Sequence, residues 1–258
     1  MDGRYPRPGR PLLAATIRPW AGAVLACCAI FVAVLGMLFA HDTRADWLDH
    51  AIDARVITWF GGHPGLAAWL AAPGSRIPVA ALSAAIVVTC LLTSQLNGAV
   101  LGAAAVPAAI GVNEALLKPL VHRTYLGSLA YPSGHTTAMF ALAATVTVLL
   151  LIPPQPGKAK ALRVLIPAAA CVLGVVVAIA VIGLRWHYFT DTLAGAAVGI
   201  GTVCGLALIL DLSTAHLWFA RANRRLPDSS SHAATRHRPE PLCSMLYLRI
   251  GSEASLGE

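Results

Sequence analysis

Residues 21–40, "AGAVLACCAIFVAVLGMLFA", form a run of apolar and small side chains that contains no charged residue. A helix of about 20 such residues spans the hydrocarbon core of a bilayer, which is about 30 Å thick. The run is too long, and lacks the small-residue cleavage pattern, to be a cleaved signal peptide. It therefore predicts a transmembrane helix that stays in the protein as a membrane anchor.

Five more apolar stretches of similar length occur further along the chain. They cover residues 77–95, 98–117, 136–154, 164–184 and 192–213. The chain of 258 residues is 57% hydrophobic and 12% charged, which is typical of an integral membrane protein and not of a soluble domain. The sequence therefore predicts an all-α polytopic membrane protein in which residues 20–213 form one bundle of six transmembrane helices.

The distribution of lysine and arginine predicts the orientation of the bundle. Positively charged loops tend to stay in the cytoplasm, and with the N-terminus inside, 13 of the 19 basic residues fall on the inner side. We therefore expect a plasma-membrane protein with cytoplasmic tails at residues 1–19 and 214–258, the second of them polar and disordered. Because the basic residues flank the spans, the net charge of +7 does not indicate nucleic-acid binding.

Residues 41–75 differ from the predicted spans in being only partly apolar. They carry three tryptophans, Trp47, Trp59 and Trp69, in a stretch with some amphipathic character. Tryptophan concentrates at the two interfaces of a membrane. The segment therefore predicts one or two helices that lie along the outer interface and cover the mouth of the bundle.

Polar residues gather where the third, fourth and sixth spans are expected to meet the outer surface. The stretches are "NEALLKPLVHR" at 113–123, "YPSGH" at 131–135 and "LRWHYFTD" at 184–191. With the predicted orientation, all three lie at the same membrane surface, where a bundle can bring their side chains together. Their basic residues run against the charge rule for outer loops, which indicates a role other than topology.

These residue types suit the binding of a phosphate group. Lys118, Arg123 and Arg185 supply positive charge, and the backbone amides of "SGH" lie at the N-terminus of the fourth span, where anions are favoured. Gly134 lets the backbone approach a ligand closely, and Ser133 adds a hydroxyl donor. The three clusters together predict a phosphate site.

Two histidines and an aspartate supply the groups for phosphoryl transfer. His187 and Asp191 are four residues apart, so on a helix they share a face and the carboxylate can fix the imidazole tautomer. His187 is then the candidate nucleophile, with His135 as the general acid for the leaving group and later the base for water. Glu114 lies one turn before Lys118 inside a predicted span, so it either supports the site or pairs with the lysine.

This arrangement resembles the type-2 phosphatidic acid phosphatase superfamily, which also includes vanadium haloperoxidases. The second motif of that family, Pro-Ser-Gly-His, is complete at residues 132–135, and the end of its third motif, His-x-x-x-Asp, is complete at 187–191. The resemblance covers about residues 20–212 and implies a phosphohydrolase that needs no metal or other cofactor. The roles that it carries over are phosphohistidine formation for His187, orientation of that histidine for Asp191, protonation of the leaving group for His135, and phosphate binding for Lys118, Ser133 and Gly134.

The resemblance also implies a substrate class. Integral bacterial members act on lipid phosphates and diphosphates, including polyprenyl diphosphate, phosphatidic acid and phosphatidylglycerol phosphate. A site facing outward at membrane depth suits such a lipid, because its tail can remain in the bilayer while its headgroup enters between helices. The partners expected for this chain are therefore a membrane lipid phosphate and the bilayer.

The chain departs from the family pattern at two places. In the first motif, Lys followed by six residues and Arg-Pro, Tyr125 and Leu126 stand in place of Arg-Pro. In the third motif, the Ser-Arg pair falls on Ala180 and Val181. We expect Arg123 and Arg185, which lie nearby in the sequence, to reach the phosphate from new positions.

Several other functions remain as alternatives. Two of them keep the fold: a degenerate site that binds a lipid phosphate without turnover, and a phosphotransferase that discharges the phosphohistidine to an alcohol. A transporter is disfavoured because the sequence has no inverted repeat. A metal or haem site is disfavoured because no thiolate or carboxylate cluster joins the histidines, and the six cysteines, which mostly lie within spans, form no C-x-x-C pair.

Overall fold

The computed structural model describes residues 11–151 and 160–223. In this part of the chain the helices follow one another closely. One antiparallel hairpin, whose two strands have two residues each, interrupts them. The helices are α1 (Arg18–Leu38), α2 (Trp47–Phe60), α3 (Pro64–Ala71), η1 (Ala72–Gly74), α4 (Arg76–Leu92), α5 (Leu96–Gly111), η2 (Val112–Leu117), α6 (Lys118–Val121), α7 (Gly134–Leu151), α8 (Lys160–Gly183) and α9 (Phe189–Asn223), and the hairpin strands are β1 (Thr124–Tyr125) and β2 (Ser128–Leu129).

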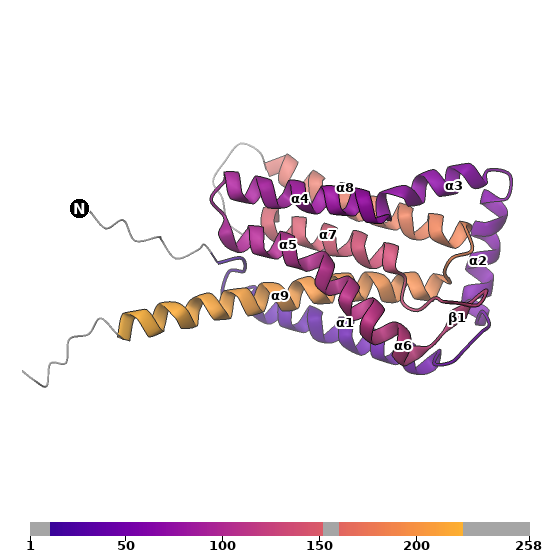
Figure 1. Cartoon of the computed structure of the whole chain (residues 1–258), viewed down its shortest axis with the longest axis horizontal. Helices are drawn as coiled ribbons and strands as arrows, with labels where there is room; N and C mark the ends of the chain where they lie inside the picture. The colour runs from indigo at the N-terminus through magenta and orange to yellow at the C-terminus, as the bar shows by residue number, and fades with distance from the viewer. Residues whose placement is uncertain (1–10, 152–159, 224–258) are drawn as a thin grey trace, which may run out of the picture. The chain divides into compact units, whose positions relative to one another are not determined.

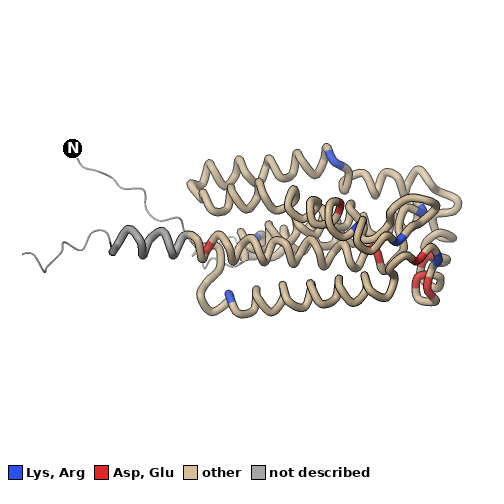
Figure 2. The backbone as a smooth tube through the Cα atoms, turned by 60° about the horizontal axis from the view of Figure 1, so that its bottom comes forward, with Lys and Arg blue, Asp and Glu red and all other residues tan. Residues whose placement is uncertain are grey.

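Six helical segments are long and apolar enough to cross a membrane, which confirms the predicted fold class. They are Arg18–Leu38, Pro64–Leu92, Leu96–Val121, Gly134–Leu151, Ala161–Gly183 and Phe189–Ser213. Their outward side chains are large and apolar, as expected of surfaces that face lipid. Figure 2 shows that the acidic and basic residues gather mainly at the end of the bundle that carries α2 and the hairpin.

Helix α7 is the central helix of the bundle. Half of the residues in its most apolar stretch are buried, compared with 17% for α1. Helix α7 packs against α4, α5 and α8 (Figure 1). Small residues allow α9 to approach it closely: a Cβ added at Gly195 would lie 2.6 Å from the carbonyl oxygen of Ser133. This contact holds the start of α9 against the turn that precedes α7.

The segment 41–75 does not lie wholly along the interface as predicted. Helix α2 does run across one end of the bundle, but α3 lies alongside α8 and continues into α4 as a single candidate span (Figure 1). The reason is composition, because α3 is apolar throughout and buries Ala67 and Ala71 completely or nearly so. The exposed Trp59 and Trp69 side chains remain on the outer surface of these helices.

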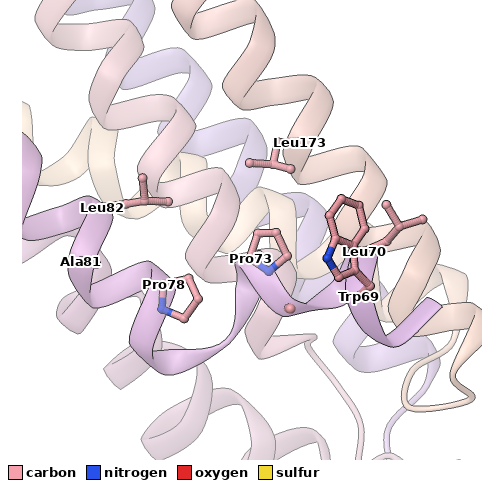
Figure 3. Close-up of a pocket in the computed structure, with 8 residues that line it drawn as sticks. Trp69, Leu70, Pro73, Pro78, Ala81, Leu82 and Leu173 are labelled. Atoms are coloured by element: carbon pink, nitrogen blue, oxygen red, sulfur yellow. The ribbon is translucent and has the colours of Figure 1, made fainter. Parts of the chain in front are cut away.

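The turn η1 breaks the second span into two helices. Its sequence, Ala-Pro-Gly, combines a residue without a backbone N–H with one that has no side chain. Gly74 is required here, because a Cβ would lie 2.8 Å from Val177 and 3.2 Å from the His135 ring. On the outside of this break lies a hollow of about 520 Å³ lined by apolar side chains, among them Trp69, Pro73 and Leu173 (Figure 3).

The start of the predicted C-terminal tail differs from the prediction. Helix α9 continues to Asn223, so residues 214–223 are helical and not part of a disordered tail. The remainder of that predicted tail, and residues 1–10 of the first, lie outside the described residues. Residues 12 and 13 are held at the start of the bundle, because their backbone N–H groups donate to the two carboxylate oxygens of Asp211 at 2.7 and 2.9 Å.

Replacing Asp211 with alanine is expected to lower the melting temperature of the detergent-solubilised protein. The change removes the acceptor of two buried backbone N–H groups, and each buried group left without a partner costs about 1–3 kcal/mol. Differential scanning fluorimetry measures the effect. Asp46→Ala is the matched control, because the Asp46 side chain makes no capping hydrogen bond to α2; equal melting temperatures for the two variants would contradict the prediction.

Candidate active site

The three polar clusters meet in one pocket. The pocket has a volume of about 1080 Å³ and receives side chains from α4, α5, η2, α6, α7, the hairpin and the turn before α9. Its ionisable residues are Arg76, Glu114, Lys118, Tyr125, His135, Arg185 and His187. Two histidines therefore share a cavity with three basic side chains at one end of the bundle, and of these three the sequence predicted Lys118 and Arg185.

His187 is buried, and one ring nitrogen has a fixed partner. Its Nδ1 lies 2.8 Å from the carbonyl oxygen of Ala130. Burial, followed by the positive charge of Lys118, lowers the pKa of His187 to about 3, so the imidazole is neutral at physiological pH. A carbonyl oxygen can only accept a hydrogen bond, so the single ring proton is on Nδ1. This tautomer leaves the lone pair of Nε2 available to the pocket.

The prediction that Asp191 orients His187 directly is corrected by this geometry. The carboxylate of Asp191 accepts hydrogen bonds from Arg123 Nη1 at 2.8 Å and from the backbone N–H of Tyr188 at 3.0 Å. The orienting acceptor of His187 is instead the backbone of Ala130, which belongs to the segment between the hairpin and α7. Asp191 therefore holds the residue next to the histidine and not its ring.

The prediction that Arg123 binds phosphate is also wrong. Its side chain has no exposed surface and does not line the pocket. The guanidinium donates to Asp49 Oδ2 at 2.6 Å and to Asp191 Oδ1 at 2.8 Å, so carboxylates occupy the positions that a phosphate would take. Burial alone would lower the pKa of Arg123, but Asp191 and Asp49 together raise it above its ordinary value, which keeps the guanidinium charged.

Lys118 and Arg185 do line the pocket. Lys118 Nζ forms an ion pair with Glu114 Oε1 at 2.8 Å, and a π-helical turn, η2, presents Glu114 to the site. The same carboxylate lies against Gly134, because a Cβ added there would be 3.2 Å from Oε1. Arg185 follows the end of α8 in the left-handed conformation, with φ of 57°, and so turns the chain toward His187.

His135 stands at the first turn of α7, where its ring lies 5.4 Å from that of Trp186. Ser133 precedes it and is fully buried, with its Oγ accepting a hydrogen bond from Thr136 at 3.1 Å. The backbone N–H of Ser133 donates to the carbonyl of Asp191, which joins the turn to α9. The Pro-Ser-Gly-His turn and the last motif are thus one structural unit.

Two pocket residues were missed by the sequence analysis. Arg76 begins α4 and lines the pocket, although it stands far from the three clusters in sequence. Tyr125, at the position where the family has arginine, lines it as well. Burial and the neighbouring Asp53 raise the pKa of Tyr125, so its phenol stays protonated and offers a hydrogen bond without charge. In the described ranges no group of three or more His, Cys, Asp or Glu residues is placed to hold a metal ion.

The protonation of Asp53, an acidic residue of α2, can be tested by the pH dependence of stability. Burial and the nearby Asp49 raise its pKa to about 7. The folded protein therefore takes up a proton on this carboxyl, and its stability falls as pH rises from about 4 to about 7. Asp53→Asn, which keeps the acceptor for the Phe189 N–H, is expected to melt higher than the unmodified protein at pH 8. If the difference in melting temperature between Asp53→Asn and the unmodified protein does not shrink as pH falls toward 4, the prediction is wrong.

Comparison with known proteins gives two matches to this architecture. The sequence profile of the PAP2 superfamily matches residues 79–215, which is more than half of the chain. The structure is similar to the crystal structure of the first transmembrane PAP2-type phosphatidylglycerolphosphate phosphatase from Bacillus subtilis, with a TM-score of 0.54 and 16% sequence identity. That alignment covers 80% of this chain and 98% of the other. No curated protein matches the chain significantly in sequence.

Proposed function

The chain belongs to the PAP2 superfamily, and on this premise we propose that it is a metal-independent membrane phosphatase that hydrolyses a lipid phosphate or diphosphate through a phosphohistidine on His187. The observation that carries the proposal is the state of that histidine. Its Nδ1–H is held by the Ala130 carbonyl, it is neutral, and its Nε2 is left free in a pocket that also holds His135 and cationic side chains. A nucleophile needs this combination of orientation and an available lone pair.

The reaction follows from the groups in the pocket. Nε2 of His187 attacks phosphorus, the bond between phosphorus and the leaving oxygen breaks, and His135 protonates that oxygen. Water then attacks the phosphohistidine while His135 takes its proton, and inorganic phosphate leaves. Lys118, Arg185 and Arg76 neutralise the phosphoryl oxygens, and the amide of Gly134 donates to them at the N-terminus of α7.

The apolar part of the pocket supports a lipid as the substrate. Its wall is formed by side chains of α4 and α5, two helices within candidate membrane spans: Val79, Ala80, Ala103, Val106 and Ile110. A lipid tail placed along this wall stays in an apolar environment while its phosphate reaches the histidines. The named activity of the similar Bacillus structure adds phosphatidylglycerol phosphate to the candidate substrates. We place the site at the extracytoplasmic face of the plasma membrane and both termini in the cytoplasm, from the charge rule.

One observation favours a second function. With Arg123 buried, the cations that face the phosphate differ in position from those of the family pattern, and Glu114 competes for Lys118. A protein that binds a lipid phosphate without hydrolysing it is therefore the alternative. A phosphotransferase differs from the hydrolase only in the acceptor of the second step, which an alcohol in place of water would reveal.

The deciding experiment measures phosphate release by the purified protein in detergent with a chelator present. The substrates are phosphatidylglycerol phosphate, phosphatidic acid, a polyprenyl diphosphate and a soluble phosphomonoester, and the blank is His187→Gln. Release from a lipid substrate that depends on His187 supports the hydrolase. Lipid binding without release, in a preparation that melts cooperatively, would favour the alternative and overturn the proposal.

A further inference from the structure

We propose that Asp49 and Arg123 form a positioning pair that fixes the direction and tautomer of His187 through the backbone of Ala130. The proposal rests on the function proposed for His187 and adds a residue of α2 to the machinery of that site. Asp49 lies in α2, before the residues that match the family profile. The pair acts on the histidine through other groups and does not contact the substrate.

A continuous series of contacts leads from Asp49 to His187. Asp49 Oδ2 accepts a hydrogen bond from Arg123 Nη2 at 2.6 Å. The backbone carbonyl of Arg123 accepts from the N–H of Ala130 at 2.9 Å. The carbonyl of Ala130 in turn accepts from His187 Nδ1 at 2.8 Å. Fixing the arginine side chain therefore fixes the peptide that selects the histidine tautomer.

A second series reaches His187 from the other side. Nη1 of Arg123 donates to Asp191 Oδ1 at 2.8 Å, and Asp191 Oδ2 accepts from the N–H of Tyr188 at 3.0 Å. Tyr188 is the residue that follows His187. Arg123 thus holds the acceptor of the imidazole through its backbone carbonyl, and the residue next to the imidazole through its guanidinium, which constrains the ring at two points.

Helix α2 is tied to the same unit by its acidic residues. Asp49 Oδ1 accepts from the backbone N–H of Thr190 at 2.8 Å, and Oδ2 accepts from the Thr190 hydroxyl at 2.9 Å. These contacts place a negative charge at the N-terminus of α9, where it is favoured. Asp49 therefore joins α2, Arg123 and the helix that begins directly after His187.

The burial of Asp49 and Arg123 indicates that the pair positions His187 more than it stabilises the fold. Asp49, Arg123 and Asp191 have no exposed side-chain surface, and the guanidinium lies between the rings of Phe39 and Tyr188 at 4.1 and 4.3 Å. Apolar residues of similar volume often stabilise a protein as well as a buried ion pair does. Apolar residues cannot form directional hydrogen bonds. In this protein the hydrogen bonds of the pair lead to His187.

The test compares Asp49→Asn with Asp53→Asn. Both variants replace a carboxyl group of α2 with an amide of nearly the same shape, but Asp53 does not bond to Arg123 and instead accepts the Phe189 N–H. For Asp49→Asn we expect kcat to fall by roughly 10–100-fold, as when an outer partner of a functional histidine is lost, with KM within about threefold. Asp53→Asn is expected to keep kcat within about twofold, because the asparagine keeps the acceptor for the Phe189 N–H and Asp53 makes no hydrogen bond to Arg123.

A second measurement is independent of turnover. Spectra of protein labelled with nitrogen-15 at histidine report the tautomer of each ring, and the His187 signal is identified by its absence in His187→Gln. We expect the Nδ1–H form in the unmodified protein and in Asp53→Asn, and a mixture of tautomers in Asp49→Asn. If the unmodified protein turned over no lipid, the proposed function would fail while this comparison would still decide the positioning role.

Two results would overturn the inference. One is an Asp49→Asn protein that melts cooperatively and keeps both the His187 tautomer and kcat; the other is an equal loss of kcat in Asp53→Asn. If Asp49→Asn does not fold, Thr190→Val takes its place, because it removes a hydroxyl that bridges Arg123 Nη1 and Asp49 Oδ2 without removing charge. The expected effect of Thr190→Val is a fall in kcat of roughly 3–10-fold with the same shift in tautomer.

Discussion

Replacing His187 with glutamine is expected to lower kcat/KM for a lipid phosphate by about a thousandfold or more and to abolish the phosphoenzyme. The glutamine amide can still reach the Ala130 carbonyl, so the turn should keep its shape. It has no basic lone pair on nitrogen and cannot attack phosphorus. The variant therefore separates loss of the nucleophile from loss of the fold.

Rapid-quench experiments with a lipid labelled in the phosphoryl group measure this effect. A phosphohistidine is labile in acid and stable in base, so label that stays on the unmodified protein only under basic conditions identifies it. The matched control is His50→Gln, because His50 is exposed on α2 and does not line the pocket. Label retained on His187→Gln would mean that a different residue carries the phosphate.

The sequence predicted the fold because apolar length is a direct consequence of bilayer thickness. The errors occurred at boundaries. The second span was expected to begin at residue 77, but the structure continues it through α3 from Pro64, since Arg76 and the Ala-Pro-Gly break mark a bend in the span and not its end. Helix α9 likewise passes the end of its apolar run, because polarity does not end a helix and the first proline beyond it is Pro227.

For the site, the sequence predicted which residues meet but not how each is used. Lys118, His135, Arg185 and His187 were expected at one surface, and all four line one pocket. The partner of Arg123 was not predictable, because Asp49 is 74 residues away and no spacing rule relates the two. The acceptor of His187 is a backbone carbonyl, which has no signature in the sequence at all.

Replacing His135 with glutamine is expected to have an effect that depends on the leaving group. A general acid contributes about 10²–10⁴-fold to the rate when a proton must be given to the leaving oxygen. An alkoxide released from a lipid phosphate needs that proton, whereas the oxygen of an activated aryl phosphate departs without it. The formation of the phosphoenzyme from the aryl ester should therefore be slowed less than its formation from the lipid, by roughly tenfold or more.

The assignment of His135 as the acid depends on its place in the same pocket as the nucleophile. Both histidines line the same pocket, and Gly74 and Trp186 pack against the His135 ring and hold it in place. The measurement is the burst rate for each substrate, because the burst isolates the first chemical step from the second, in which His135 acts as a base. If His135→Gln slows the burst equally for both substrates, the histidine binds the phosphate and is not the proton donor. A selective loss for the lipid would identify it as the acid and would leave Lys118, Arg185 and Arg76 as the groups that carry the phosphate charge.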